Sequence, residues 1–209
     1  MYVTHKPIIL ASTSPRRREL LTLAGLPFTV VPSPASEPAP EPGETPAAYA
    51  ARMATLKGAA VAADNPQAIV LGADSVVTVD GLILGKPRDA ADARRMLGLL
   101  SGRTHQVVTG CALFGLADAP QAFTVATDVT MIALPESTLA AYVDTGEPMG
   151  KAGAYAIQGR AAAFVTRING SYTNVVGLPL AEVLETLLFH GVGAPRENVP
   201  PVHLKLPTP

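Results

Sequence analysis

The first half of the chain alternates short apolar runs with segments that begin as helices do, and this alternation is the strongest constraint on its fold. Residues 7–11 and 27–31 have the continuous apolar character of buried strands. Residues 14–25 and 45–63 begin with Ser-Pro or Thr-Pro, a common start for a helix. Such alternation predicts an α/β architecture in which helices pack on a sheet.

The middle of the chain predicts strands that turn back on themselves. Residues 68–79 contain two strand-like runs joined at Gly72-Ala73-Asp74, and Asp80-Gly81 is a hairpin signal. Residues 105–114 and 122–134 predict two long strands around a turn. A long hairpin beside alternating strands and helices makes the predicted sheet a mixed one.

The remainder of the chain predicts helices over residues 89–100, 135–143 and 179–190 and a strand over residues 163–168. No internal repeat or linker divides the chain, so we expect one domain over residues 1–191. Five prolines between Pro195 and Pro209 predict that residues 192–209 form a loose tail.

Composition restricts the classes of protein. The formal net charge is −1 and 5% of the residues are aromatic, whereas a nucleic-acid-binding module needs a broad basic surface with stacking residues. The apolar run near the N-terminus spans four residues, too short for a signal peptide or a membrane span. The single cysteine, Cys111, cannot form an intramolecular disulfide. We therefore expect a cytoplasmic protein with neither nucleic acid nor membrane as its partner.

The segment from Ala11 to Arg18, Ala-Ser-Thr-Ser-Pro-Arg-Arg-Arg, joins a predicted strand to a predicted helix start. Backbone N–H groups and the dipole at a helix N-terminus favour an anion there. Ser12 and Ser14 add hydroxyl donors, while Arg16 and Arg17 add guanidinium groups that match phosphate oxygens. Consecutive cations in a first helical turn are unfavourable without an anion. The segment therefore predicts a phosphate site, with a solvated basic helix start as the alternative.

Three weaker signals accompany this segment. Asp74 lies between two β-branched runs, either as a turn former or as a carboxylate held at a sheet edge. Lys86 lies between Gly and Pro after a hairpin, where a plain surface lysine is the alternative. The Gly-rich residues 146–159 predict close approach to a ligand, and Gln158 offers a donor and an acceptor to a base edge. Together these residues predict a site for a polyphosphate attached to a base.

The same segments resemble the Maf family of nucleotide pyrophosphatases. They run in the family's order over residues 7–190 and include Ile9-Leu-Ala-Ser-Thr-Ser-Pro-Arg-Arg-Arg18, Gly72-Ala-Asp-Ser-Val-Val77, Gly85-Lys-Pro87 and Gly170-Ser-Tyr-Thr-Asn-Val-Val-Gly-Leu-Pro179. The resemblance implies a two-lobed, mixed-sheet α/β fold like that of inosine triphosphate pyrophosphatases, with the nucleotide in the cleft between the lobes. It also implies a nucleoside triphosphate substrate and a divalent metal cation, Mg²⁺ or Mn²⁺. Homodimers are common in the family.

The resemblance assigns roles residue by residue. Asp74 matches the family's catalytic carboxylate, with Lys86 and Lys57 beside it in the catalytic set. Glu37 and Asp74 are the expected metal ligands, because hard cations take oxygen ligands. The expected phosphate-binding residues are Ser12, Ser14, Arg16 and Arg17. The residues expected to set substrate specificity are Arg16, Ser75 and Gln158.

Arg16 and Gln158-Gly159 favour the family branch that acts on dTTP and UTP. The branch that acts on 7-methyl-GTP has an aromatic residue at the position of Arg16, and Ser75 keeps the hydroxyl of a commoner Thr. We therefore expect hydrolysis of dTTP and UTP to the monophosphate and pyrophosphate, with Asp74 acting either as a base or as a metal ligand. The alternatives are a 7-methyl-GTP pyrophosphatase and a non-catalytic nucleotide-binding regulator of cell division.

Overall fold

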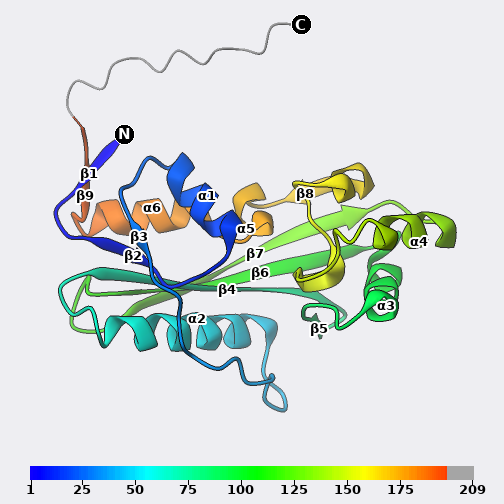
Figure 1. Ribbon diagram of the computed structural model, residues 1–209, viewed down its shortest axis with the longest axis horizontal. Helices are drawn as coiled ribbons and strands as arrows, with labels where there is room; N and C mark the ends of the chain where they lie inside the picture. The colour runs from blue at the N-terminus through cyan, green and yellow to red at the C-terminus, as the bar shows by residue number, and fades with distance from the viewer. Residues whose placement is uncertain (197–209) are drawn as a thin grey trace, which may run out of the picture.

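The computed structural model describes residues 1–196, in which seven strands form one mixed sheet (Figure 1). The strand order is β3–β2–β4–β6–β7–β8, and β5 pairs with β4. The strands β2, β3 and β4 are parallel, whereas all other pairings in this sheet are antiparallel. Their bounds are β2 Ile8–Leu10, β3 Thr29–Val30, β4 Ile69–Val79, β5 Leu82–Leu84, β6 Thr104–Phe114, β7 Gln121–Met131 and β8 Val165–Asn169. The prediction of an α/β fold with a mixed sheet is confirmed.

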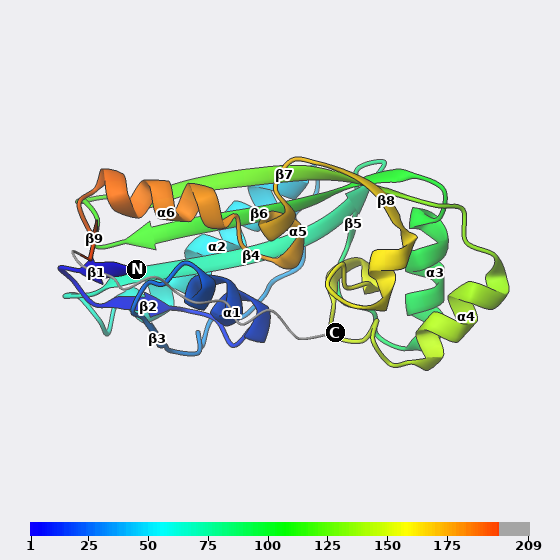
Figure 2. The ribbon, with the colours of Figure 1, turned by 90° about the horizontal axis from the view of Figure 1, so that it is seen from above.

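Helices cover both faces of the sheet. Figure 1 shows α2 (Pro46–Ala62) on one face and α1 (Pro15–Leu23), α5 (Tyr172–Val176) and α6 (Leu180–Phe189) on the other. At one end of the sheet, α3 (Ala90–Leu100) and α4 (Glu136–Asp144) gather with two short 3₁₀ turns, Ala152–Ala154 and Arg160–Phe164 (Figure 2). No helix among residues 1–196 is both long enough and apolar enough to cross a membrane.

The central strand β4 contains a gap in its pairing that matters for the site. One of its edges pairs with β6 from Val70 to Thr78. The other edge pairs with β2 at residues 69–71 and with β5 at residues 77–79. Between these two partners lies Asp74. Its carboxylate therefore stands where the sheet is open on one side, although its backbone is held firmly by β6.

This arrangement corrects one prediction from the sequence. Gly72-Ala73-Asp74 does not join two strands, because residues 69–79 form one continuous strand. Gly72 serves packing rather than a turn. A side chain at Gly72 would collide with the carbonyl oxygen of Ala54 in α2, and one at Gly110 in β6 would collide with that of Ala50. Glycine at both positions lets α2 lie directly on the sheet.

The end of the described chain also differs from the prediction. The loose tail was predicted to begin at residue 192, but β9 (Gly193–Pro195) pairs antiparallel with β1 (Tyr2–Thr4). Val192 is buried as well. The prediction is therefore wrong for residues 192–195, and the rest of the predicted tail, residues 197–209, lies outside the described residues.

Candidate functional site

A pocket of about 350 Å³ lies at the open edge of β4, and its lining residues come from α2 on one face of the sheet and from α1 on the other. Segments that are distant in the sequence line it: the β2–α1 turn at residues 11–17, strand β4 at residues 74–77, and residues 150–155 and 175–177. A volume of this size suits a small-molecule ligand. The predicted site residues Ser12, Ser14, Arg16, Arg17, Glu37, Lys57, Asp74, Ser75 and Lys86 all line it.

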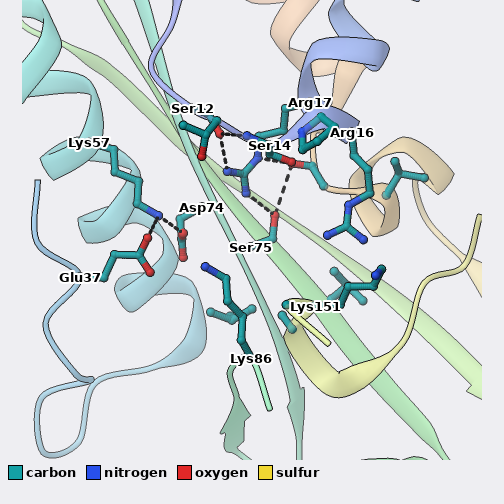
Figure 3. Close-up of a pocket in the computed structure, with 18 of the residues that line it drawn as sticks. Ser12, Ser14, Arg16, Arg17, Glu37, Lys57, Asp74, Ser75, Lys86 and Lys151 are labelled. Carbon is teal, nitrogen blue, oxygen red and sulfur yellow. Dashed lines mark hydrogen bonds and ion pairs between the residues drawn. The ribbon is translucent and has the colours of Figure 1, made fainter. Parts of the chain in front are cut away.

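Two carboxylates and one ammonium form a cluster at one end of the pocket. The Lys57 Nζ lies 2.6 Å from Asp74 Oδ1 and 2.8 Å from Glu37 Oε1 (Figure 3). The hydrogen bond from Lys57 holds the pKa of the Glu37 carboxyl below its ordinary value. The Lys57 side chain is only 13% exposed, as its place between the two carboxylates requires. Because α2 packs closely on β4, the Lys57 ammonium lies within hydrogen-bond distance of Asp74 and Glu37.

Arg17 is almost fully buried, and each of its three side-chain nitrogens donates to the protein. Nε donates to the Gly177 carbonyl at 2.8 Å, Nη1 to Ser12 Oγ at 3.3 Å and Nη2 to Ser75 Oγ at 3.1 Å. Burial lowers the pKa of Arg17, while Asp74 acts in the opposite direction. The guanidinium thus links three segments of the pocket wall through Gly177, Ser12 and Ser75, and it places a positive charge next to the pocket.

Arg16, the neighbouring residue, lies differently. Its side chain points into the pocket, and it has no hydrogen-bond or ion-pair partner within residues 1–196 (Figure 3). Burial lowers its pKa, and Glu19 acts in the opposite direction. Lys86 also lines the pocket without a carboxylate partner in the described part of the chain, and its ammonium approaches the Asp74 end. Both cations are available to an anionic ligand.

Lys151 is a further pocket cation, which was not among the predicted site residues. Its Nζ donates to the Glu147 carbonyl at 2.5 Å, and the structure gives it no carboxylate partner among residues 1–196. Burial and the nearby Arg16 guanidinium both lower the pKa of Lys151. The Gly-rich character of residues 146–159 was the signal that could have identified it. Glycine at position 153 is required because its φ is +68° and a side chain there would collide with Val77.

The N-terminus of α1 faces the same pocket. Ser14 is the N-cap residue, but its side chain makes no capping hydrogen bond, and Ser12 Oγ accepts from the Ser14 backbone N–H at 3.2 Å. The first backbone N–H groups of a helix lack intrahelical partners and favour an anion. This end of the pocket therefore combines backbone donors, hydroxyl groups and cations.

The opposite end of the pocket is apolar. The residues that form this wall are Val77, Val107, Ala152, Tyr155, Val175 and Val176. Tyr155 is buried, and its hydroxyl is bonded to His105 Nε2 at 2.8 Å. Asp74 and Val77 are three residues apart on β4, so their Cα atoms lie about 10 Å apart and their side chains leave opposite faces of the sheet.

Two predicted specificity residues occupy different environments. The Ser75 hydroxyl lies in the pocket wall, bonded to Thr109 Oγ1 at 2.8 Å and to Arg17. Gln158 is exposed and does not line the pocket. The structure thus brings together all predicted site residues except Gln158. The arrangement suits a ligand with a strongly anionic part joined to a flat, apolar part.

Known proteins are similar to this chain over most of its length. Residues 7–189 match the family described as Maf-like protein. A dTTP/UTP pyrophosphatase of Nitratidesulfovibrio vulgaris is 48% identical over 96% of this chain and 91% of its own. A dTTP/UTP pyrophosphatase of Geobacter metallireducens is 53% identical over 88% of this chain and 96% of its own. A dTTP/UTP pyrophosphatase of Moorella thermoacetica is 51% identical over 88% of this chain and 95% of its own.

Among solved structures, the chain is similar to a HAM1 protein from Coxiella burnetii. The TM-score is 0.47 with 19% sequence identity, and the match covers 88% of this chain and 98% of the other. For the Ham1 protein of Staphylococcus aureus the TM-score is 0.43 with 18% sequence identity, and the match covers 60% of this chain and 72% of the other.

Proposed function

This chain belongs to the family of Maf-like proteins, and we propose that it hydrolyses dTTP or UTP to the nucleoside monophosphate and pyrophosphate. Relatives that are about half identical over nearly the whole chain carry the name dTTP/UTP pyrophosphatase. These names favour pyrimidine triphosphates over 7-methyl-GTP. The retained Asp74–Lys57–Glu37 cluster favours catalysis over simple nucleotide binding.

The observation that carries this proposal is the division of the pocket into a polar end and an apolar end. The triphosphate binds at the polar end, where the α1 N-terminus, Lys86 and Arg16 supply donors and positive charge. The base extends past the open edge of β4 to the apolar wall at Val77 and Tyr155. The phosphates and the base thus meet lining residues of different character.

Asp74 orients the attacking water. Lys57 occupies its Oδ1, and Oδ2 has no protein partner within residues 1–196, so Oδ2 is available to accept a proton from water. The water oxygen forms a bond to the α-phosphorus, and the bond from that phosphorus to the bridging oxygen breaks. The electron pair leaves with pyrophosphate. Lys86 and the α1 N-terminus stabilise the negative charge that develops, which is the main catalytic effect of such preorganised groups.

The residues present fit a divalent metal cation. Mg²⁺ is commonly bound by one or two carboxylates together with substrate phosphates and water. Glu37 and Asp74 converge on the same point, where the Lys57 ammonium lies between them, so this position already favours positive charge. Within residues 1–196 no group of three or more His, Cys, Asp or Glu side chains could hold a metal, so the substrate would complete the ligand set. When bound, Mg²⁺ or Mn²⁺ would neutralise phosphate oxygens.

The proposal is tested by pyrophosphate release from dTTP, UTP, CTP, GTP, ATP and 7-methyl-GTP with Mg²⁺ or Mn²⁺ present. We expect release from dTTP and UTP and much slower release from the others. Preference for 7-methyl-GTP would contradict the proposed substrates. No release from any nucleotide by the folded, metal-supplied protein would contradict the proposed reaction.

A further inference from the structure

The groups that recognise the base are not explained by the catalytic cluster. Gln158, predicted to read the base edge, lies outside the pocket. Lys151 lies inside it, directly before the apolar wall residues Ala152 and Tyr155. Figure 3 shows Lys151 and Arg16 on the side of the pocket away from Asp74 and Glu37. Because Arg16 serves the triphosphate, Lys151 is the cation placed to meet the end of the substrate that carries the base.

We propose that Lys151 selects uracil and thymine by donating a hydrogen bond to the C4 carbonyl oxygen of the base. This role rests on the proposed function and deepens it. Lysine and arginine side chains carry hydrogen-bond donors and no acceptors. Uracil and thymine carry a carbonyl oxygen at C4, which accepts such a bond, whereas their C2 carbonyl is shared with cytosine. Cytosine and adenine present an amino group on the corresponding edge, which would face another donor.

The position of the Lys151 ammonium is fixed by backbone carbonyls rather than by a carboxylate. It donates to the carbonyl of Glu147 at 2.5 Å and to that of Met149 at 3.5 Å, which leaves one of its three N–H donors. Glu147 is itself fixed, because its carboxylate accepts from the Tyr142 hydroxyl at 2.8 Å and from the backbone N–H of Arg160 at 3.1 Å. An ammonium that is positioned in advance loses little freedom when it binds a ligand. Lys151 therefore has one donor left for the pocket.

The apolar wall makes such selection strong. Val77, Val107 and Tyr155 shield the base from water, so an amino group that faces Lys151 could not find a replacement partner easily. A buried site built to hydrogen-bond one group rejects an analogue that leaves polar atoms unpaired. Discrimination between UTP and CTP follows directly from this donor-only arrangement.

The test compares Lys151→Met with the wild-type protein for two substrates and one product. We expect the ratio of kcat/KM for UTP to that for CTP to fall by about tenfold or more. Inhibition by inorganic pyrophosphate should change by less than about twofold, which would distinguish a base contact from a phosphate contact. Lys151→Arg, which keeps the donors, should retain most of the preference. Lys6→Met, at an exposed lysine outside the pocket, is the matched control.

An unchanged UTP to CTP ratio in folded Lys151→Met would overturn the inference, as would weakened pyrophosphate inhibition with that ratio unchanged. Calorimetric binding of UMP and CMP keeps the inference separate from the proposed function. If the wild type hydrolyses no nucleotide but prefers UMP, and Lys151→Met loses this preference, the proposed reaction fails and the inference stands. If both proteins bind UMP and CMP alike, the inference fails whatever the reaction.

Discussion

The two ends of the pocket use charge in opposite ways. At the Asp74 end, the ammonium of Lys57 is paired with two carboxylates within the protein. At the Lys151 end, Lys151 and Arg16 have no carboxylate partner among residues 1–196. Paired charges define a geometry before the substrate arrives. Unpaired charges in a partly desolvated pocket gain most of their interactions from the ligand.

Two adjacent residues of α1, Arg16 and Arg17, show the same contrast between a charge paired within the protein and a charge left for a ligand. Arg17 is buried and donates to Ser12, Ser75 and Gly177, whereas Arg16 faces the pocket with no partner in the described part of the chain. Identical side chains at neighbouring positions therefore serve architecture and ligand binding separately. A loss of function at either position would have a different physical cause.

The largest effect is expected at the paired end. Asp74→Asn removes the carboxylate that orients water, and turnover of UTP should fall on the order of 10²-fold or more. Circular dichroism and thermal unfolding would verify that the variant is folded. If Asp74→Asn retains near-normal turnover, Asp74 takes no part in the chemistry and the proposed role of the paired end is wrong.

A second effect concerns the support of the apolar end. Burial lowers the pKa of His105, the partner of Tyr155, to about 4. The unfolded chain binds a proton with a pKa near 6.5, so stability is full above this pH and is lost as the pH falls toward 4. Between pH 7.5 and pH 5 we expect His105 to account for a loss of about 2 kcal/mol in the free energy of unfolding.

Urea unfolding at both pH values measures this loss. His105→Gln keeps a hydrogen-bonding group without the titration, so its stability should depend less on pH by about the same amount. Equal pH dependence in the variant and the wild type would show that His105 is not held neutral by burial.

A smaller effect is expected from Arg17→Lys. Lysine has a single nitrogen and cannot reach Gly177, Ser12 and Ser75 together, so the pocket walls should shift and kcat should fall roughly tenfold. Arg18→Lys is the matched control, because Arg18 is exposed and does not line the pocket. An equal, small change in both variants would contradict the architectural role of Arg17.

The smallest effect is expected from Gln158→Ala. The side chain is exposed and outside the pocket, so the ranking of UTP, dTTP and CTP should change by less than about twofold. A clear change in that ranking would return base recognition to Gln158 and weaken the role given to Lys151.

These contrasts also show how far the sequence could be interpreted. The mixed α/β sheet and the pocket set around Asp74, Lys57 and Arg16 follow from apolar runs, helix starts and family motifs. Gly72-Ala73-Asp74 was misleading because local turn propensity is overridden by pairing with β6. Arg16 and Arg17 have different roles because the first turn of α1 points one side chain into the pocket and the other into the protein. The sequence does not show which way this turn faces. Lys151 lies in a segment that was predicted to approach a ligand, but no role could be assigned to it because its position depends on how the Gly-rich segment folds.

The central claim is that water attacks the α-phosphorus beside Asp74. Hydrolysis of UTP in ¹⁸O-labelled water tests this directly, with the products analysed by mass spectrometry. The proposed mechanism predicts one labelled oxygen in UMP and none in pyrophosphate. Label in pyrophosphate would mean attack at the β-phosphorus, and formation of UDP with labelled phosphate would mean attack at the γ-phosphorus. Either of these results would contradict the placement of the substrate in the pocket.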